Sequence, residues 1–173
     1  YLYVQYIAFL ISRTEIERAR QLGERAIRNV NFPNEQAKLN LYLSLLNLES
    51  KFGDKQTLND IYRRACSACA PIPIWKRYVH IHIESQNHDR VENLLKMGVK
   101  KFKNEVEVWK FYIRYVVTTK KSHKEAKALL KRALLVLPQH QHVSLIEYLG
   151  KCEFEFGSKN RGITIFEGLI TSH

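Results

Sequence analysis

Several residue types that shape many small proteins are scarce in this chain of 173 residues. It contains 7 glycines, 4 prolines, 3 cysteines and 1 methionine. We expect the glycines and prolines to stand between periodic segments, and no low-complexity tract or linker-like stretch divides the chain. The small number of cysteines suits a reducing compartment. One continuous domain covering residues 1–173 is therefore expected.

The sequence also lacks long apolar runs and the common catalytic motifs. No apolar stretch approaches the roughly 20 residues of a membrane-spanning helix, so no membrane partner is expected. A Gly-rich phosphate loop, a Gly-x-Ser-x-Gly elbow and a partner set for a nucleophilic Cys or Ser are all missing. We therefore predict that the chain is not an enzyme, needs no cofactor and takes no small-molecule substrate.

Two short motifs invite comparison with metal sites. Cys66 and Cys69 form a C-x-x-C pair, but there is no second pair and Cys152 lies far along the chain. On a helix both thiols would share one face, where small residues ease packing, so packing is favoured over half a zinc site or a redox pair. The His-x-His pairs at 80–82 and 140–142 have no accompanying carboxylate cluster. No metal site is predicted.

The strongest positive signal is a pair of aromatic or aliphatic residues, spaced by three, that recurs five times. The first members are Tyr3, Tyr42, Trp75, Trp109 and Ile146, and the second members are Tyr6, Leu45, Tyr78, Tyr112 and Leu149. Successive pairs lie 39, 33, 34 and 37 residues apart. A period in the mid-thirties that alternates two amphipathic helices is typical of a solenoid, in which each helical hairpin stacks on its neighbours to bury its apolar face. Such proteins hold other molecules and rarely catalyse reactions.

We interpret these recurring pairs as the repeat core. Exposed aromatic side chains interleaved with basic residues can stack single-stranded bases. Here, however, the pairs recur at the repeat period and at i, i+3, which is the spacing that packing between helices requires. The residues assigned to the core are Tyr3, Tyr6, Tyr42, Leu45, Trp75, Tyr78, Trp109 and Tyr112.

The periodicity of apolar residues and the positions of turn-forming residues predict ten helices and essentially no strand. This pattern indicates an all-α, right-handed solenoid of about five hairpins. The expected repeats cover residues 1–31, 34–70, 72–103, 105–138 and 140–172. Pro71 and Pro73 are expected to end the second repeat, and Thr14 is expected to cap the second helix. Because helix is already under way at Tyr1, we interpret the chain as a piece of a longer protein.

The same residues resemble the half-a-tetratricopeptide, or HAT, repeat. In that family the first helix carries an aromatic pair spaced by three with an acidic residue four further on, and the second helix ends in Arg-Ala or Lys-Ala before a proline. The second repeat reads Tyr42, Leu45, Glu49 and Gly53, followed by Arg64-Ala65 and Pro71. The fifth reads Ile146, Leu149, Glu153 and Gly157, while Arg25-Ala26 and Arg132-Ala133 close the first and fourth.

Three repeats depart from this pattern at the acidic position, which is Leu10, His82 and Val116 in the first, third and fourth. The HAT resemblance implies a contact from the acidic residue of the first helix to the arginine of the second. We therefore expect this internal contact only between Glu49 and Arg64. Packing is expected to supply most of the stability.

Within the HAT family the chain is similar to the C-terminal HAT region of large ribosomal RNA processing proteins, the programmed cell death protein eleven family. The resemblance is carried by residues 16–27, by Val30-Asn31-Phe32 and by Leu45-Leu46-Asn47-Leu48-Glu49. It implies a nucleolar scaffold that follows an array of oligonucleotide-binding folds and serves small-subunit ribosome assembly. The chain itself is expected to be a monomer. The implied partners are pre-rRNA and assembly factors. A protein-binding or dimerising HAT module of a splicing or messenger RNA 3′-end processing factor is the alternative.

The positive charge is unevenly distributed. Between Lys96 and Arg132 there are twelve basic residues and three acidic ones, a net +9 out of the chain's +11. A patch of one sign focuses potential and attracts phosphate backbones. The candidate contact residues are Lys76, Lys100, Lys101, Lys103, Lys110, Arg114, Lys120, Lys121, Lys124, Lys127 and Lys131. An RNA-binding surface, a surface for an acidic protein and lysines that only solvate the array all stay open.

Overall fold

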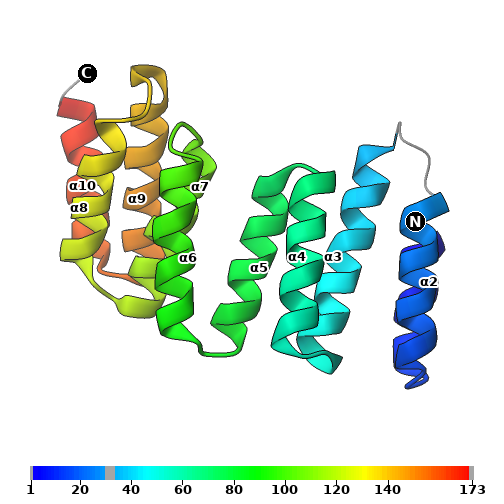
Figure 1. Cartoon of the computed structure of the whole chain (residues 1–173). Coiled ribbons are helices and arrows are strands. Elements are labelled where there is room, and N and C mark those ends of the chain that lie inside the picture. Colours follow the sequence, from blue (N-terminus) through cyan, green and yellow to red (C-terminus); the bar gives the residue numbers. More distant parts are fainter. Residues whose placement is uncertain (1, 30–33, 172–173) are drawn as a thin grey trace. The chain divides into compact units, whose positions relative to one another are not determined.

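The computed structural model describes residues 2–29 and 34–171, and within them the chain has ten α-helices and no strand (Figure 1). The α-helices are α1 (Leu2–Ser12), α2 (Ile16–Asn29), α3 (Glu35–Phe52), α4 (Lys55–Ala68), α5 (Pro71–Glu84), α6 (His88–Lys101), α7 (Val106–Tyr115), α8 (His123–Leu134), α9 (His142–Phe156) and α10 (Lys159–Thr171). A π-helical turn, η1 (Val116–Lys120), follows α7, and a short 3-10 helix, η2 (Gln139–Gln141), precedes α9. The predicted all-α solenoid fold is confirmed.

The chain divides into two compact units, Tyr1–Val91 and Glu92–His173. The predicted ends of the first and fifth repeats, together with the Val30-Asn31-Phe32 connection, fall partly or wholly outside the described residues. The two units are described separately below.

Helix boundaries follow local chemical signals in most places. The Asp54 carboxylate accepts a hydrogen bond of 2.7 Å from the backbone N–H of Thr57, and the Asp54 N–H donates back to the Thr57 hydroxyl at 3.1 Å. This capping box satisfies two N–H groups that the first turn of α4 leaves unpaired. α4 ends at Ala68, and Pro71 then begins α5, where its missing N–H breaks no helical hydrogen bond.

The expectation that Thr14 caps α2 is wrong. Thr14 has a φ of 62°, its hydroxyl donates to the Arg13 carbonyl at 2.6 Å, and α2 begins two residues later at Ile16. The Glu15 carbonyl accepts the first helical hydrogen bond instead, from the backbone N–H of Ala19. The turn is therefore closed by a left-handed residue rather than by a side-chain cap.

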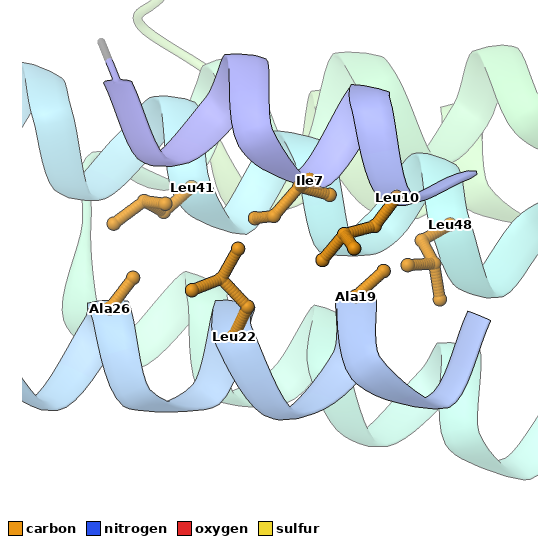
Figure 2. Close-up of a cluster of buried hydrophobic side chains, with 7 residues drawn as sticks. All are labelled: Ile7, Leu10, Ala19, Leu22, Ala26, Leu41 and Leu48. Atoms are coloured by element: carbon orange, nitrogen blue, oxygen red, sulfur yellow. The ribbon is translucent and has the colours of Figure 1, made fainter. Parts of the chain in front are cut away.

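In the first unit, three helices share one apolar cluster, which Figure 2 shows between α1, α2 and α3. Its buried members are Ile7, Leu10, Ala19, Leu22, Ala26, Leu41 and Leu48. The alanines on α2 are fully buried, and at Gly23 an added Cβ would overlap the side chain of Leu45 on α3. Small residues on α2 therefore set how closely the first hairpin approaches the second.

The recurring aromatic and aliphatic pairs occupy buried positions in most repeats. Six of the eight assigned core residues are at most 7% exposed: Tyr42, Leu45, Trp75, Tyr78, Trp109 and Tyr112. Tyr3 is half-buried against the first cluster, whereas Tyr6 is 48% exposed and stacks on Phe9. Tyr6 differs because α1 contacts α2 and α3 through Ile7 and Leu10, which lie on another face of the helix.

The expectation that glycines stand only between periodic segments is wrong: in the second unit, α9 and α10 pack closely because each carries a glycine within the helix. A Cβ at Gly162 on α10 would lie 2.7 Å from the Cβ of Phe154 and 2.9 Å from its backbone. A Cβ at Gly150 on α9 would lie 3.1 Å from the ring of Phe166. The last hairpin is thus held at a separation that larger side chains would not allow.

Candidate nucleic-acid interface

Ten of the eleven candidate basic residues lie in the second unit. Lys100 and Lys101 end α6, Lys103 follows it, Lys110 and Arg114 lie on α7, Lys120 ends η1, Lys121 comes next, and Lys124, Lys127 and Lys131 lie on α8. The eleventh, Lys76, lies on α5 in the first unit and is partly buried. The candidate interface is therefore considered within the second unit alone.

Three lysines of α8 form an exposed row, which we call the α8 lysine face: Lys124, Lys127 and Lys131. The buried residues of the helix are Ala126, Leu129 and Ala133, which lie on its opposite side. Among the residues that the structure describes, none of the ion pairs involves these three lysines. Their charge is therefore directed at solvent.

Lys120 differs from the α8 lysines because it is held by two carboxylates. Its ammonium contacts Glu92 on α6 and lies 3.0 Å from Glu125 on α8. Hydrogen bonds to Glu92 and then to Glu125 raise the pKa of Lys120 above its ordinary value. Lys120 thus joins α6, η1 and α8, and its charge is largely neutralised within the protein.

Two basic residues of α7 lie against aromatic rings of α9. The Lys110 ammonium is 5.7 Å from the centroid of the Tyr148 ring, and the Arg114 guanidinium is 5.4 Å from that of Phe156. Lys110 also pairs with Glu107 at 3.5 Å. These cation–π contacts join α7 to α9 and leave less of either charge available to a ligand than on the α8 lysine face.

The first of the two carboxylates that are buried among the described residues belongs to Glu49, which is 6% exposed. Arg20 on α2 donates to it from Nε at 2.8 Å and from Nη2 at 3.1 Å. The expected pairing of Glu49 with Arg64 is wrong, because Arg64 donates to both carboxylate oxygens of Glu24 on α2, at 2.8 and 2.6 Å. Both ion pairs therefore join the first hairpin to the second instead of closing one hairpin on itself.

The second buried carboxylate, Glu153 on α9, is 1% exposed. Its oxygens lie 2.7 Å from Nδ1 of His123 on α8 and 3.1 Å from Nε of Arg161 on α10. Burial raises the pKa of Glu153, but the hydrogen bonds from His123 and Arg161 outweigh this effect, so that the net pKa is lowered. Glu153 is thus held ionised between two successive hairpins. Its bond to Arg161, on the second helix of its own hairpin, is an internal contact in the fifth repeat, so the expectation of such a contact only in the second repeat is wrong.

A glycine four residues after each buried glutamate makes room for its carboxylate. A Cβ at Gly53 would overlap the Glu49 carboxylate, and a Cβ at Gly157 would overlap that of Glu153. The glutamate–glycine spacing is visible in the sequence. The cations that pair with these glutamates were not predicted. Arg20 and His123 precede their glutamates by 29 and 30 residues, and a search for basic residues at that separation would find both.

In the third repeat His82 occupies the acidic position. Its Nε2 is buried without a hydrogen-bond partner among the described residues, and its ring meets Tyr78 edge-on at 4.7 Å. Burial lowers the pKa of His82, and the charges of Arg90 and Lys55 lower it further. The imidazole is therefore neutral where the second and fifth repeats hold an anion.

We expect His82 to make the chain acid-sensitive below about pH 6.5. Because its folded pKa lies below the unfolded one, the stability from neutral His82 is present above pH 6.5 and lost as pH falls through the folded pKa. The lowered pKa of Glu153 also makes the chain less stable in acid, but only below the ordinary glutamate pKa of 4.5. Urea unfolding from pH 7.5 to 5 should show a steeper fall for the parent than for His82→Gln, and equal slopes would contradict this assignment.

The cysteine pair and the histidines do not form a cluster that could hold a metal in the described part of the chain. Cys66 lies on α4 and Cys69 caps its end, both partly buried and free of disulfides. Burial raises the pKa of the Cys69 thiol, which disfavours the reactive thiolate. As for membranes, none of the described helices has the length and apolar character needed to cross one.

Comparison with known proteins gives two kinds of match. A family model described as the PRP39 N-terminal HAT repeat matches residues 68–143. The rRNA biogenesis protein rrp5 of Schizosaccharomyces pombe is 34% identical over 99% of this chain, and RRP5 of Arabidopsis thaliana is 30% identical over 100% of it. The human protein RRP5 homolog is 32% identical over 99% of the chain.

The chain spans about a tenth of the length of these curated relatives, 10% of the fission yeast protein and 9% of the plant and human ones. The similarity nevertheless runs from one end of the chain to the other in a fungus, a plant and a mammal. Together with the HAT match and the all-helical structure, it shows that the chain belongs to the RRP5 family of HAT-repeat proteins.

Proposed function

We propose that this chain is a non-catalytic scaffold in ribosome biogenesis, and that its second unit contacts pre-rRNA while the solenoid also binds assembly factors. Relatives named as rRNA biogenesis proteins, similar over the whole chain, support the general process. The single observation that supports RNA contact is the α8 lysine face, exposed and unpaired within a stretch of net charge +9. A monomer acting in the nucleus, and in the nucleolus in particular, is part of this proposal.

The geometry of the α8 lysine face suits a phosphate backbone. Lys124 and Lys131 are seven residues apart, which is about 10 Å along a helix axis. One strand of a duplex carries a phosphate about every 3.4 Å of helix axis, and phosphates are spaced more widely in an extended single strand, so each of the three ammonium groups can meet a phosphate over this length. No sequence preference follows, because contacts to phosphates carry no base information.

Charge reversal on this face is expected to abolish most RNA binding. In the variant Lys124→Glu/Lys127→Glu/Lys131→Glu, three phosphate contacts are lost, so the log–log dependence of affinity on salt should become shallower by about 2. Fluorescence anisotropy with a short unstructured RNA across a salt series measures both effects. Lys120 is left unchanged, because its ion pairs with Glu92 and Glu125 hold the fold.

A matched control reverses three exposed arginines of the first unit, Arg13, Arg18 and Arg25. Arg20 is excluded because it pairs with the buried Glu49. We expect the control variant to keep most of its RNA affinity, since acidic neighbours such as Glu15 and Glu24 already dilute the potential in this region. Equal losses in both variants, or binding that salt does not weaken, would refute the proposed RNA surface.

A further inference from the structure

A groove of about 500 Å³ lies in the second unit between α8 and α10, with α9 at its floor. Its apolar lining comes from all three helices: Leu130 of α8, Ile146 and Leu149 of α9, and Ile165 and Leu169 of α10. Apart from Gly168, the other residues that line the groove are polar or charged: His123, Lys127, Arg161 and Thr164. The groove is thus a site where apolar side chains of a ligand could be desolvated.

The charged residues along the groove are all of cationic type. Lys127 is exposed and unpaired on one wall, and Arg161 is 46% exposed on the other, with only its Nε bonded to Glu153. No aspartate or glutamate is among the residues that line it. Charge complementarity therefore favours a ligand that combines apolar side chains with carboxylates.

Gly168 opens the groove on the α10 side. A Cβ placed there would meet no other atom within 4 Å, so the absence of a side chain leaves free space beside Leu169. A glycine in the interior of a helix is destabilising relative to alanine. The packing of α10 does not require this glycine, unlike Gly162, whose Cβ would overlap Phe154.

We propose that this groove binds a short amphipathic, acidic segment of a partner protein. Leu, Ile, Phe or Met side chains of the segment pack on Leu130, Ile146 and Ile165, and its carboxylates pair with Lys127 and Arg161. Such helix-in-groove recognition uses anchors at i, i+3 or i+4 and i+7. RNA fits this groove less well, because its lining contains no Phe, Tyr or Trp ring on which a base could stack, and its one imidazole, His123, is held by Glu153.

This proposal rests on the proposed binding of protein partners and gives that binding a site. It involves a different class of partner from the RNA surface. The α8 lysine face binds phosphates through exposed ammonium groups, whereas the groove binds apolar side chains. Lys127 belongs to both sites. A variant on α10 is therefore needed to separate them.

The test selects peptides from a random 15-residue phage library against the whole chain and measures the enriched peptides by fluorescence anisotropy. We expect them to be acidic, with two or more Leu, Ile, Phe or Met residues three or four apart. Gly168→Trp fills the groove and should weaken their binding at least tenfold, while leaving RNA affinity unchanged. Gly168→Ala, the matched control, adds a methyl group into open space and should bind like the parent.

Methyl NMR of the unmodified chain gives a readout that does not depend on any variant. On addition of an enriched peptide, the Ile146 and Ile165 methyl signals should shift, while those of Ile7 and Ile74 in the first unit should not. The proposed groove site would be refuted if the enriched peptides were basic or if Gly168→Trp bound them as tightly as the parent. Methyl shifts confined to other parts of the chain would refute it as well. Loss of RNA binding in Gly168→Trp would show that the two surfaces are not separate and would equally overturn it.

Discussion

Replacing Trp109 with Ala is expected to lower the free energy of unfolding by roughly 3 to 5 kcal/mol. The indole is 3% exposed, and its Nε1 donates a hydrogen bond of 2.8 Å to the Lys103 carbonyl just before α7. The substitution therefore leaves a large cavity and an unpaired carbonyl together. Because a domain of this size has a total stability of about 5 to 15 kcal/mol, the variant should melt early or fail to fold.

Urea unfolding followed by circular dichroism measures this loss, and two variants serve as controls. Trp109→Phe keeps most of the ring and should lose about 1 to 3 kcal/mol, largely from the missing hydrogen bond. Tyr6→Ala removes an aromatic residue from the equivalent pair in the first repeat, but its side chain is 48% exposed and little burial is lost. An unchanged midpoint for Trp109→Ala would refute the assignment of these pairs to the repeat core.

A second large effect is expected when Glu153 loses both of its partners. In His123→Ala/Arg161→Ala the carboxylate, 1% exposed, has no cation beside it. Leaving a buried charge without compensation typically costs 3 to 5 kcal/mol, so we expect a loss of about that size at pH 7. Thermal and urea unfolding of the double variant against the parent measure it.

The sign of the pH dependence tests the cause of that loss. Without His123 and Arg161, burial alone acts on Glu153 and raises its pKa, so the difference from the parent should shrink as pH falls. Adding Glu153→Gln removes the charge and should restore much of the lost stability at pH 7. A difference that is constant from pH 7 to 5, or a triple variant no more stable than the double, would show that the loss comes from packing alone.

Local chemistry explains why the helices could be predicted from the sequence. Pro71 removes an N–H and Asp54 offers a side-chain acceptor, and each acts within one turn of its own position. The buried pairs likewise follow from a period that any hairpin solenoid must keep. These features depend on neighbouring residues along the chain and not on which helix is packed opposite.

Contacts between separate helices could not be predicted in the same way. Glu49 was expected to pair with Arg64, but Arg20 on the preceding helix pairs with it, and Arg64 pairs with Glu24. In the sequence Lys120 is indistinguishable from the α8 lysines, but in the structure η1 places it against Glu92. Charge counting treats all lysines alike, whereas the structure separates those that hold helices together from those that face solvent.

The two buried glutamates also define where the chain can be cut. In a linear array, stability is the sum of a term for each repeat and a term for each interface, as in a one-dimensional Ising chain. Glu49 and Glu153 contribute to the interface terms, because Arg20 and His123 reach them from the preceding hairpin. A truncated chain starting at Asn34 would therefore lose more than the stability of the first repeat. It would keep the buried Glu49 carboxylate but lose the Arg20 guanidinium that pairs with it. Shortened versions should start before the cation or carry Gln in place of the glutamate.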